Sequence, residues 1–380
     1  MIRRPPRSTL SSSSAASDVY KRQVRDILTM GELLRILGAR AVIEKNTARI
    51  NPEKLSNLEA PYELVKTMRA SIYVLGPLLA KYKKARVSLP GGCAIGARPI
   101  DLHIKGMKKL GAKISIRHGY VTAGAKKLKG ANIAFDKVSL GATVNIMLAA
   151  SLAEGTTVIS NASREPEITD TTGFLKKMGA DIRGAGTDTI VIKGVKKLSG
   201  ASYTVIPDRI EAATLVSAAV ITGGAVTVEK FNPSHLQLFF EKLKEAGVRF
   251  RIEKKSVSVY PLKARLKPVD ISTEPYPGFP TDIQAQWMAL MSTASGDSVI
   301  KENIWENRFM HALELMRMGA DIKTDGNTAF VSGVPGLSGA EVMASDLRAS
   351  AALILAGLAA SGRTEIRRVY HLERGYEKLQ

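Results

Sequence analysis

The stretch LKKMGADIRGAGTDTIVIKGV, residues 175–195, decides the fold because it is one copy of a phrase that recurs along the chain. A helical run ends in a corner at Gly179, and two alternating apolar and polar runs follow it. Alternation with a period of two is typical of half-buried strands, and a glycine at such a corner closes a helix. The phrase therefore predicts a helix that ends at glycine and leads into a strand hairpin.

The corner occurs five times, also as LLRILGA, MKKLGA, LKEAGV and LMRMGA. Its glycines are Gly38, Gly111, Gly179, Gly247 and Gly319, which places successive copies 73, 68, 68 and 72 residues apart. A second phrase, such as LRASAALILAGLAASGRTEIR at 347–367, predicts an Ala-rich helix followed by glycine and a strand. One unit is thus strand, helix, strand, helix and two strands in about 70 residues.

These units predict an α/β (α+β) protein of two domains, since 380 residues exceed one ordinary core. The Ala-rich helices are apolar nearly all round, so we expect them inside, with the sheets outside. A solenoid is the alternative, but its units are usually 20 to 50 residues long. The change of domain is expected between Ile206 and Pro207, which gives domains at 24–206 and 207–380.

Residues 1–23 differ in composition from the rest of the chain. They are rich in Ser and Arg and lack a hydrophobic period. A transit peptide is one interpretation, and a translated sequencing adapter joined in frame is the one we favour. We expect this non-native or disordered leader to have no fold.

The composition excludes several classes of protein. The net charge is +20, but lysines and arginines are spread in small groups without interleaved aromatic residues, which favours a solvated surface over a nucleic-acid groove. The longest apolar runs are too short to span a bilayer. A single cysteine excludes an internal disulfide and fits a reducing compartment, and with five dispersed histidines it argues against zinc. No GxxxxGK or GxGxxG motif precedes a helix.

Several motifs are more specific than the repeat. They are PYELVKTMRASI at 61–72, SLPGGCAIGARPIDLH at 88–103, DKVSLGATV at 136–144, REPEITDT at 164–171, PDRIEA at 207–212, FPTDIQAQ at 279–286, ENRFMH at 306–311, DLRAS at 346–350 and ERGYE at 373–377. With these motifs the chain resembles the enolpyruvyl transferases from residue 24 to its end. Among them it is most similar to the branch whose acceptor is UDP-N-acetylglucosamine.

The resemblance implies two inside-out α/β domains built from βαβαββ modules. It also implies transfer of the enolpyruvyl group of phosphoenolpyruvate to the 3-hydroxyl of UDP-N-acetylglucosamine, with release of phosphate, by addition and elimination. No metal or organic cofactor is implied. The implied setting is the cytoplasm, at the first committed step of peptidoglycan synthesis, where the family's enzyme is the target of fosfomycin.

Cys93 is the general acid that the resemblance implies, and its thiolate could form an adduct with phosphoenolpyruvate. A lone cysteine is otherwise more often a buried apolar residue. Gly91, Gly92 and Gly96 favour a mobile surface loop, and Arg98 would favour the thiolate by lowering its pKa.

Asp282 matches the family's base for the sugar hydroxyl. From the residues alone it could equally be a helix N-cap, because it precedes the apolar run IQAQWMALM. The resemblance also places four arginines in the cleft, where guanidinium groups bind substrate carboxylate and phosphate bidentately. They are Arg69, Arg98, Arg348 and Arg374, of which Arg374 is also expected to act in catalysis.

The resemblance implies further contacts with the substrates. They are Pro99, Ile100, Asp101, Leu102, Lys137, Val138, Ser139, Leu140 and Ile304. The run KVSLG precedes an apolar helix, so its backbone N–H groups can bind a diphosphate at the helix N-terminus, or it is an ordinary cap. His103 could orient Asp101, or could be a structural histidine.

The chain departs from the family pattern at both ends. It has no counterpart of the first strand and Lys-Asn pair, and it stops a helix and a strand early, so we expect a fragment with weak or no activity. Two other functions stay open. One is a sibling transferase acting on shikimate 3-phosphate, and the other is a non-catalytic protein that binds polyanions or nucleic acid.

Overall fold

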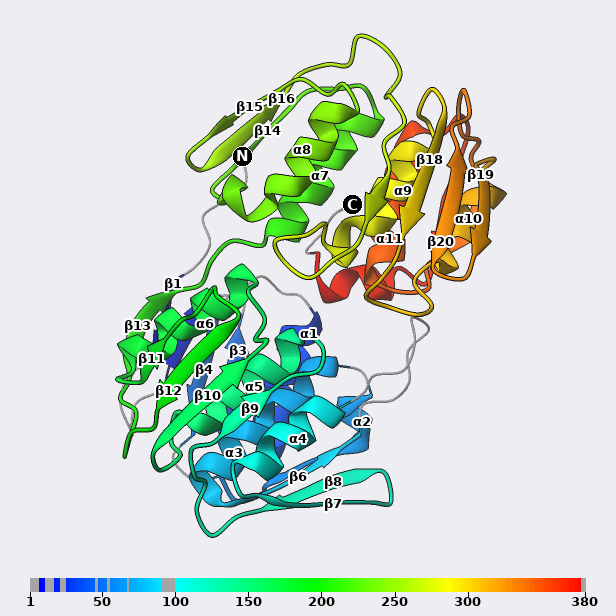
Figure 1. The fold of residues 1–380 in the computed structure, drawn as a ribbon. Coiled ribbons are helices and arrows are strands. Elements are labelled where there is room, and N and C mark those ends of the chain that lie inside the picture. The colour runs from blue at the N-terminus through cyan, green and yellow to red at the C-terminus, as the bar shows by residue number, and fades with distance from the viewer. Residues whose placement is uncertain are drawn as a thin grey trace. The chain divides into compact units, whose positions relative to one another are not determined.

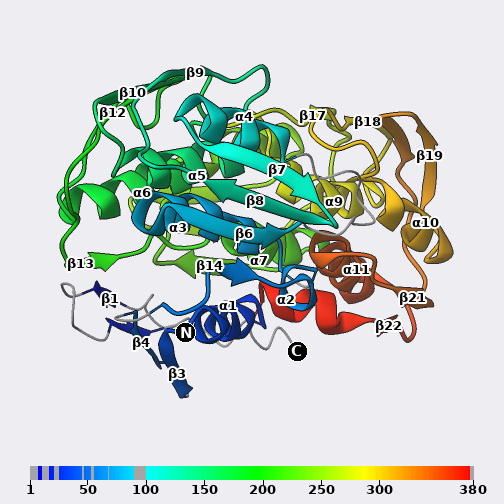
Figure 2. The same ribbon diagram turned by 90° about the horizontal axis from the view of Figure 1, so that it is seen from below.

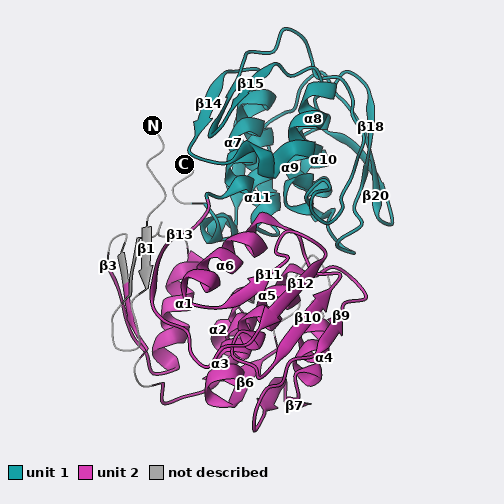
Figure 3. Ribbon diagram, turned by 60° about the vertical axis from the view of Figure 1, so that its left-hand side comes forward, with its two compact units in different colours: residues 1–4, 93–97, 207–380 teal, residues 5–92, 98–206 magenta. Residues whose placement is uncertain are grey.

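The structure, a computed structural model, describes residues 7–10, 17–20, 25–44, 47–52, 55–66, 68–89 and 100–376. The chain divides into two compact units, coloured separately in Figure 3. The described residues of unit 1 are 207–376, and those of unit 2 lie within 7–206. The division falls between Ile206 and Pro207, the position at which the sequence indicates a change of domain.

Unit 2 contains the earlier modules. Its elements are β1 (Arg7–Leu10), β2 (Ser17–Tyr20), α1 (Arg25–Ile36), β3 (Arg40–Glu44), β4 (Thr47–Asn51), β5 (Glu59–Ala60), α2 (Tyr62–Val65), η1 (Arg69–Val74), α3 (Leu75–Tyr82), β6 (Lys84–Ser88), α4 (Asp101–Lys109), β7 (Lys113–Arg117), β8 (Tyr120–Gly124), β9 (Asn132–Ala134), α5 (Leu140–Ala150), β10 (Thr156–Ser160), α6 (Pro166–Lys177), β11 (Asp181–Arg183), β12 (Thr189–Lys193) and β13 (Ala201–Thr204).

Unit 1 contains the later modules. Its elements are α7 (Arg209–Ile221), β14 (Val226–Glu229), η2 (Pro233–Leu236), α8 (Gln237–Glu245), β15 (Phe250–Glu253), β16 (Ser256–Val259), β17 (Ile271–Ser272), α9 (Thr281–Met291), β18 (Asp297–Lys301), α10 (Met310–Arg317), β19 (Asp321–Asp325), β20 (Thr328–Ser332), β21 (Glu341–Met343), α11 (Leu347–Ala359), β22 (Glu365–Arg367) and η3 (Val369–Arg374).

Three of the repeats form sheets with the same strand order. The orders are β5-β6-β8-β7, β9-β10-β12-β11 and β17-β18-β20-β19, and in each the first pair is parallel while the other two are antiparallel. Figure 2 shows the first of these sheets as one outer face, with β6, β8 and β7 side by side. The βαβαββ unit that the repeat predicts is therefore confirmed.

The five corner glycines close five helices in the same way. Helices α1, α4, α6, α8 and α10 each end two residues before their corner glycine, whose φ is positive, between 89° and 101°. At the third corner Gly179 N donates to Lys176 O and Ala180 N donates to Leu175 O, and the other four corners repeat this pair of bonds. This is the Schellman arrangement, which satisfies the last carbonyl groups of a helix.

The Ala-rich helices lie inside their units, as the sequence predicts. In α9 every residue from Ile283 to Met291 is buried, and in unit 1 this helix packs against α7 and α11 (Figure 1). In unit 2 α5 packs against α3 and α4. None of the described helices has the length and apolar character needed to cross a bilayer.

Residues 1–23 differ from the expectation of no fold. Strand β1 pairs with β13, and β2 pairs with both β1 and β4, so this segment contributes two strands to a five-stranded sheet. Pairing uses backbone N–H and C=O groups that every sequence carries, and the edges of β13 and β4 offer such groups. A lack of hydrophobic period therefore did not prevent strand formation.

The corner geometry predicts the effect of a methyl group at Gly179. Here φ is +101° and a Cβ atom would meet nothing within 4 Å, so Gly179→Ala tests backbone strain alone. We expect it to lower the free energy of unfolding by about 1–2 kcal/mol. Gly336→Ala, which also meets nothing and has no positive φ, should change it little. Equal stabilities of the two variants in urea denaturation would contradict this account.

Candidate active site

Asp282 in unit 1 forms two ion pairs through one oxygen. Its Oδ1 accepts a hydrogen bond from Nη2 of Arg308 at 3.1 Å and another from Nε of Arg348 at 3.2 Å. Helix α9 begins at Thr281 and its N-cap is Pro280, without a side-chain cap. The N-cap interpretation of Asp282 is therefore wrong: the carboxylate is in the first turn and points to the two arginines.

The second oxygen of Asp282 is open. None of the described residues donates a hydrogen bond to Oδ2, and 44% of the Asp282 side chain is exposed. Burial would raise the pKa of Asp282, but the charges of Arg348, Arg308 and Arg209 and the Arg348 hydrogen bond hold it well below its usual value. The site thus presents an ionised carboxylate with one anchored and one free oxygen.

The start of α11 positions Arg348. Asp346 is the N-cap, and its Oδ1 accepts hydrogen bonds from the backbone N of Arg348 at 2.8 Å and of Ala349 at 3.2 Å. Burial would raise the pKa of Asp346, but the charge of Arg308 and the two backbone bonds lower it. Asp346 therefore stays ionised and both caps the helix and faces Arg308.

A second set of bonds joins three helices around the site. Gln286 Nε2 donates to the backbone O of Asp282 at 3.1 Å and to Oγ1 of Thr214 at 3.2 Å. The Thr214 hydroxyl in turn lies 2.8 Å from the hydroxyl of Tyr376, which is buried against Ala351 and Leu372. This ties η3, and with it Arg374 at its last position, to α7, α9 and α11.

Glu302 organises the segment that carries Ile304. This carboxylate is 2% exposed, and its Oε1 accepts from the backbone N of Ile304 at 2.9 Å and of Trp305 at 3.1 Å. Its Oε2 accepts from the hydroxyl of Thr281 at 2.9 Å, next to Asp282. Glu302 thus fixes the expected sugar-nucleotide contact and the start of α9 together.

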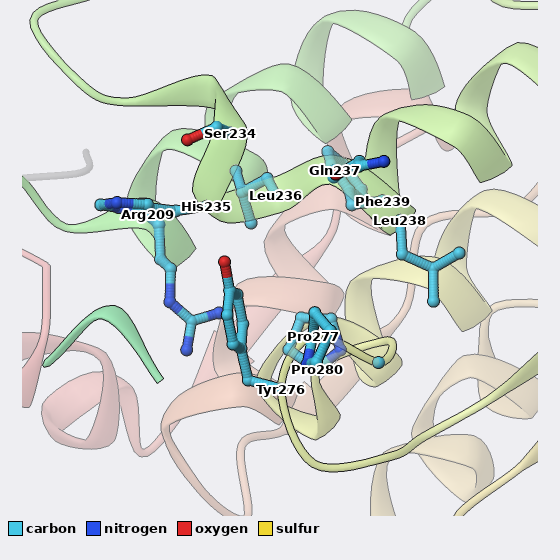
Figure 4. A pocket seen from close by; sticks show the side chains of 11 residues that line it. Arg209, Ser234, His235, Leu236, Gln237, Leu238, Phe239, Tyr276, Pro277 and Pro280 are labelled. Carbon is cyan, nitrogen blue, oxygen red and sulfur yellow. The ribbon is translucent and has the colours of Figure 1, made fainter. Parts of the chain in front are cut away.

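A pocket borders this cluster within unit 1 (Figure 4). Its lining residues are Arg209, Ser234, His235, Leu236, Gln237, Leu238, Phe239, Tyr276, Pro277, Gly278 and Pro280. The Arg209 guanidinium lies beside the ring of Tyr276, 5.7 Å from its centroid, and is also one of the charges that lower the pKa of Asp282. The pocket therefore has on its wall a cation whose charge acts on Asp282.

In unit 2 the expected nucleotide contacts gather at the N-terminus of α5. Ser139 is its N-cap, and the Ser139 hydroxyl accepts from Ala142 N at 3.2 Å. The backbone N–H groups of Leu140 and Gly141 have no acceptor among the described residues. Lys137 is exposed, whereas Val138 and Leu140 are half-buried. This end of the helix retains free donors, as a diphosphate site requires.

His103 joins this helix to its neighbours. Asn145 Nδ2 donates to Nδ1 of His103 at 3.0 Å and to the backbone O of Ile72 at 3.0 Å, while its Oδ1 accepts from Gly76 N at 2.8 Å. Nδ1 is therefore an acceptor and the proton of the neutral ring is on Nε2, next to Gly141. Burial lowers the pKa of His103 to about 4 against the opposing charge of Asp101. The structural interpretation of His103 is the one that this network supports.

The other expected residues fall into three groups. Asp101 is the exposed first residue of α4, Ile100 is its N-cap and Leu102 follows it, so these residues start the helix that packs against α5. Arg69 begins η1, and its side chain is outside the described part of the structure. Three further residues, Cys93, Arg98 and Pro99, lie outside the described residues altogether.

The structure thus brings Asp282 and Arg348 into direct contact and connects Ile304 and Arg374 to them through Glu302 and Tyr376. Residues that the sequence analysis did not single out also take part, and four of them are Arg308, Asp346, Glu302 and Tyr376. Three of them lie inside quoted motifs, and Asp346 directly before an Ala-rich helix had the signal of an N-cap. Within the described residues, no group of three or more His, Cys, Asp or Glu side chains could hold a metal ion.

The neutral state of His103 predicts a pH dependence of stability. Its pKa in the folded protein, about 4, lies below the unfolded value of about 6.5, so the unfolded state takes up the proton first as pH falls. The contribution of His103 to the free energy of unfolding therefore has its full value above pH 6.5. It falls by up to about 3 kcal/mol as the pH approaches 4. His103→Gln, which cannot titrate, should flatten the decline in urea denaturation between pH 7 and 4. His118 is exposed, and in the His118→Asn variant the decline in stability between pH 7 and 4 should equal that of the unaltered protein.

The bonds of Glu302 predict a second effect on stability. Glu302→Ala leaves two backbone N–H groups and a hydroxyl without their acceptor, so we expect a loss of about 2–4 kcal/mol of unfolding free energy. Glu302→Gln keeps one amide oxygen for the two N–H groups and should lose less than half as much. Equal losses in the two variants, measured by chemical denaturation, would show that the acceptor role is wrong.

Comparisons with known proteins give the family of this chain. Residues 12–380 match the family described as EPSP synthase (3-phosphoshikimate 1-carboxyvinyltransferase). A protein of Geotalea uraniireducens named UDP-N-acetylglucosamine 1-carboxyvinyltransferase is 58% identical over 94% of this chain and 85% of its own length. A protein of the same name from Desulfosudis oleivorans is 53% identical over 98% of this chain and 89% of its own length.

The chain is also similar in fold to solved structures of enolpyruvyl transferases. The enolpyruvyl transferase NikO from Streptomyces tendae has a TM-score of 0.83 and 26% identity, covering 98% of this chain and 95% of its own. An EPSP synthase from Acinetobacter baumannii has a TM-score of 0.68 at 22% identity, over 96% of this chain and 88% of its own, and shows the fold alone. A profile match over nearly the whole chain and relatives above 50% identity lead to one conclusion: this chain belongs to the enolpyruvyl transferase family.

Proposed function

We propose that this chain transfers the enolpyruvyl group of phosphoenolpyruvate to the 3-hydroxyl of UDP-N-acetylglucosamine and releases phosphate. The observation that carries the proposal is Asp282, an ionised carboxylate with Oδ1 held by two arginines and Oδ2 open. The names of relatives at 53–58% identity give UDP-N-acetylglucosamine as the acceptor and a carboxyvinyl group as the group transferred. Such a reaction belongs to peptidoglycan synthesis, and the single cysteine fits a cytoplasmic location.

The base and the acid act on different atoms. The sugar hydroxyl gives its proton to Oδ2 of Asp282 while its oxygen bonds to C2 of phosphoenolpyruvate. The C3 methylene takes a proton from the thiol of Cys93 and becomes a methyl group. Elimination then breaks the bond from C2 to the phosphate oxygen and returns a proton from C3 to the Cys93 thiolate, which restores the double bond in the product and releases phosphate.

The anionic groups of the two substrates require cations and N–H donors. Arg69, Arg98, Arg348 and Arg374 are the proposed partners for carboxylate and phosphate, of which Arg348 already contacts Asp282. The free N–H groups at the start of α5, with Lys137 exposed beside them, are proposed for the diphosphate of the nucleotide. Ile304, held by Glu302, is proposed to contact the sugar nucleotide.

The choice of acceptor is the point to test first. We expect phosphate release from phosphoenolpyruvate with UDP-N-acetylglucosamine and none with shikimate 3-phosphate, the acceptor named in the matching family description. Release with shikimate 3-phosphate alone would replace this proposal by the sibling activity. Binding of DNA that weakens steeply with salt, without phosphate release, would favour a polyanion-binding protein.

Asp282 provides a sharper prediction for the base. Asp282→Asn keeps the shape of the side chain but cannot take a proton, so kcat for phosphate release should fall by about 100-fold or more. Asp325→Asn, at an exposed position of β19, is the matched control and should leave kcat unchanged. Full turnover by Asp282→Asn would remove Asp282 from the role of base.

A further inference from the structure

The two arginines that bind Asp282 differ in the solvent exposure of their side chains. The Arg308 side chain is 5% exposed, whereas that of Arg348 is 16% exposed. Both donate to Oδ1 at nearly equal distances, 3.1 Å and 3.2 Å. A substrate anion therefore has access to the second arginine and little access to the first.

The surroundings of Arg308 keep it in place. Its charge lowers the pKa of Asp346 as well as that of Asp282, so it lies in the field of two carboxylates. His311, on α10, is buried and its pKa is lowered to about 4 by that burial, so it adds no second positive charge beside Arg308 at neutral pH. Separating this guanidinium from both carboxylates would leave a charge buried without a partner.

Arg348 has a different set of neighbours. Besides Asp282, the charge of Asp208 acts on it, and it hydrogen-bonds to the hydroxyl of Tyr376. Burial by itself would lower the pKa of Arg348, but these groups, Asp282 first, keep it above its usual value. Asp282 thus occupies, on Arg348, a position that a carboxylate or phosphate oxygen of a ligand could take instead.

We propose that Asp282 and a substrate anion compete for Arg348, and that Arg308 is the positioning residue that keeps Oδ1 of Asp282 anchored when Arg348 turns to the anion. Without the anion, both arginines stabilise the ionised carboxylate, so Asp282 is a weak base. When the anion shares the charge of Arg348, the proton affinity of Oδ2 rises. The base is then effective only when the second substrate is in place.

The inference rests on the proposed function, in which Arg348 binds phosphoenolpyruvate and Asp282 is the base. Charged and titratable groups face this cluster from each neighbouring element. They are Asp208 and Arg209 at the start of α7, Glu302 after β18, Arg308 and His311 before and on α10, Asp346 and Arg348 at the start of α11, His371 and Arg374 on η3, and Tyr376 after η3. Of these groups, Asp346 and His311 also feel the charge of Arg308, so Arg308→Gln removes its effect on them as well as on Asp282.

Competition for Arg348 can be tested without turnover. Calorimetric titration with inorganic phosphate at pH 7.5 should give about 10-fold tighter binding to Asp282→Asn, because the competing carboxylate has lost its charge. Arg348→Gln should bind phosphate about 10-fold more weakly than the unaltered protein. Arg317→Gln removes an exposed arginine that pairs with Glu314 and should change nothing. Phosphate affinity in Asp282→Asn that is equal to or weaker than that of the unaltered protein would overturn the competition.

The positioning role of Arg308 has its own readout, the pH profile of kcat/KM. Arg308→Gln removes a positive charge that lowers the pKa of Asp282, so the acid limb should move to higher pH, by one unit or more. Arg308→Lys keeps the charge and should return the limb toward its original position. A fall in kcat with an unmoved limb in Arg308→Gln would show that Arg308 has only a structural role.

The two proposals fail in different ways. If phosphate is released with shikimate 3-phosphate and not with UDP-N-acetylglucosamine, the proposed function is wrong, while the phosphate titrations still decide the competition. If phosphate is released but Asp282→Asn binds phosphate no more tightly, the function stands and the competition is wrong.

Discussion

One carboxylate oxygen shared by two guanidinium groups is the constraint around which unit 1 is arranged. Arg308 is almost fully buried, and a buried cation without a partner is strongly destabilising, so the loop before α10 must bring it to Asp282. Arg348 must arrive at the same oxygen from α11, and the Asp346 cap sets where that helix begins. The remaining contacts, through Gln286, Thr214 and Tyr376, hold the three helices at the separation that this pairing needs.

Local rules explain how much of the fold could be predicted. Gly179 and its four counterparts end their helices with the same two backbone bonds, because a positive φ is readily adopted by glycine and the motif needs only neighbours in sequence. The interior position of α9 follows from its composition, as no polar face exists to meet water. Both features are encoded within about ten residues, which is the range over which periodicity can be read.

The candidate site was only partly predictable, because its bonds join residues far apart in the chain. Arg308 lies 26 residues from Asp282 and Arg348 lies 66 residues from it, and no local pattern marks either pairing. An aspartate near a helix start serves equally as a cap or as a first-turn residue, so the sequence left its role open. Glu302 gave no signal at all, since a buried carboxylate is identified by the N–H groups around it. Backbone pairing explains why β1 and β2 formed in a segment whose composition argued against structure.

The N-termini of the three interior helices of unit 1 lie at the candidate site. Arg209, Asp282 and Arg348 each lie in the first turn of α7, α9 or α11, so three helix N-termini meet at one place. Each such end carries a partial positive charge of roughly half a unit, which attracts anions before any side chain is specialised. A single module has one such helix end. The repeated modules of unit 1 bring three of them together, and their partial positive charges add. The attraction of this place for anions thus comes from the repeated backbone as well as from the side chains.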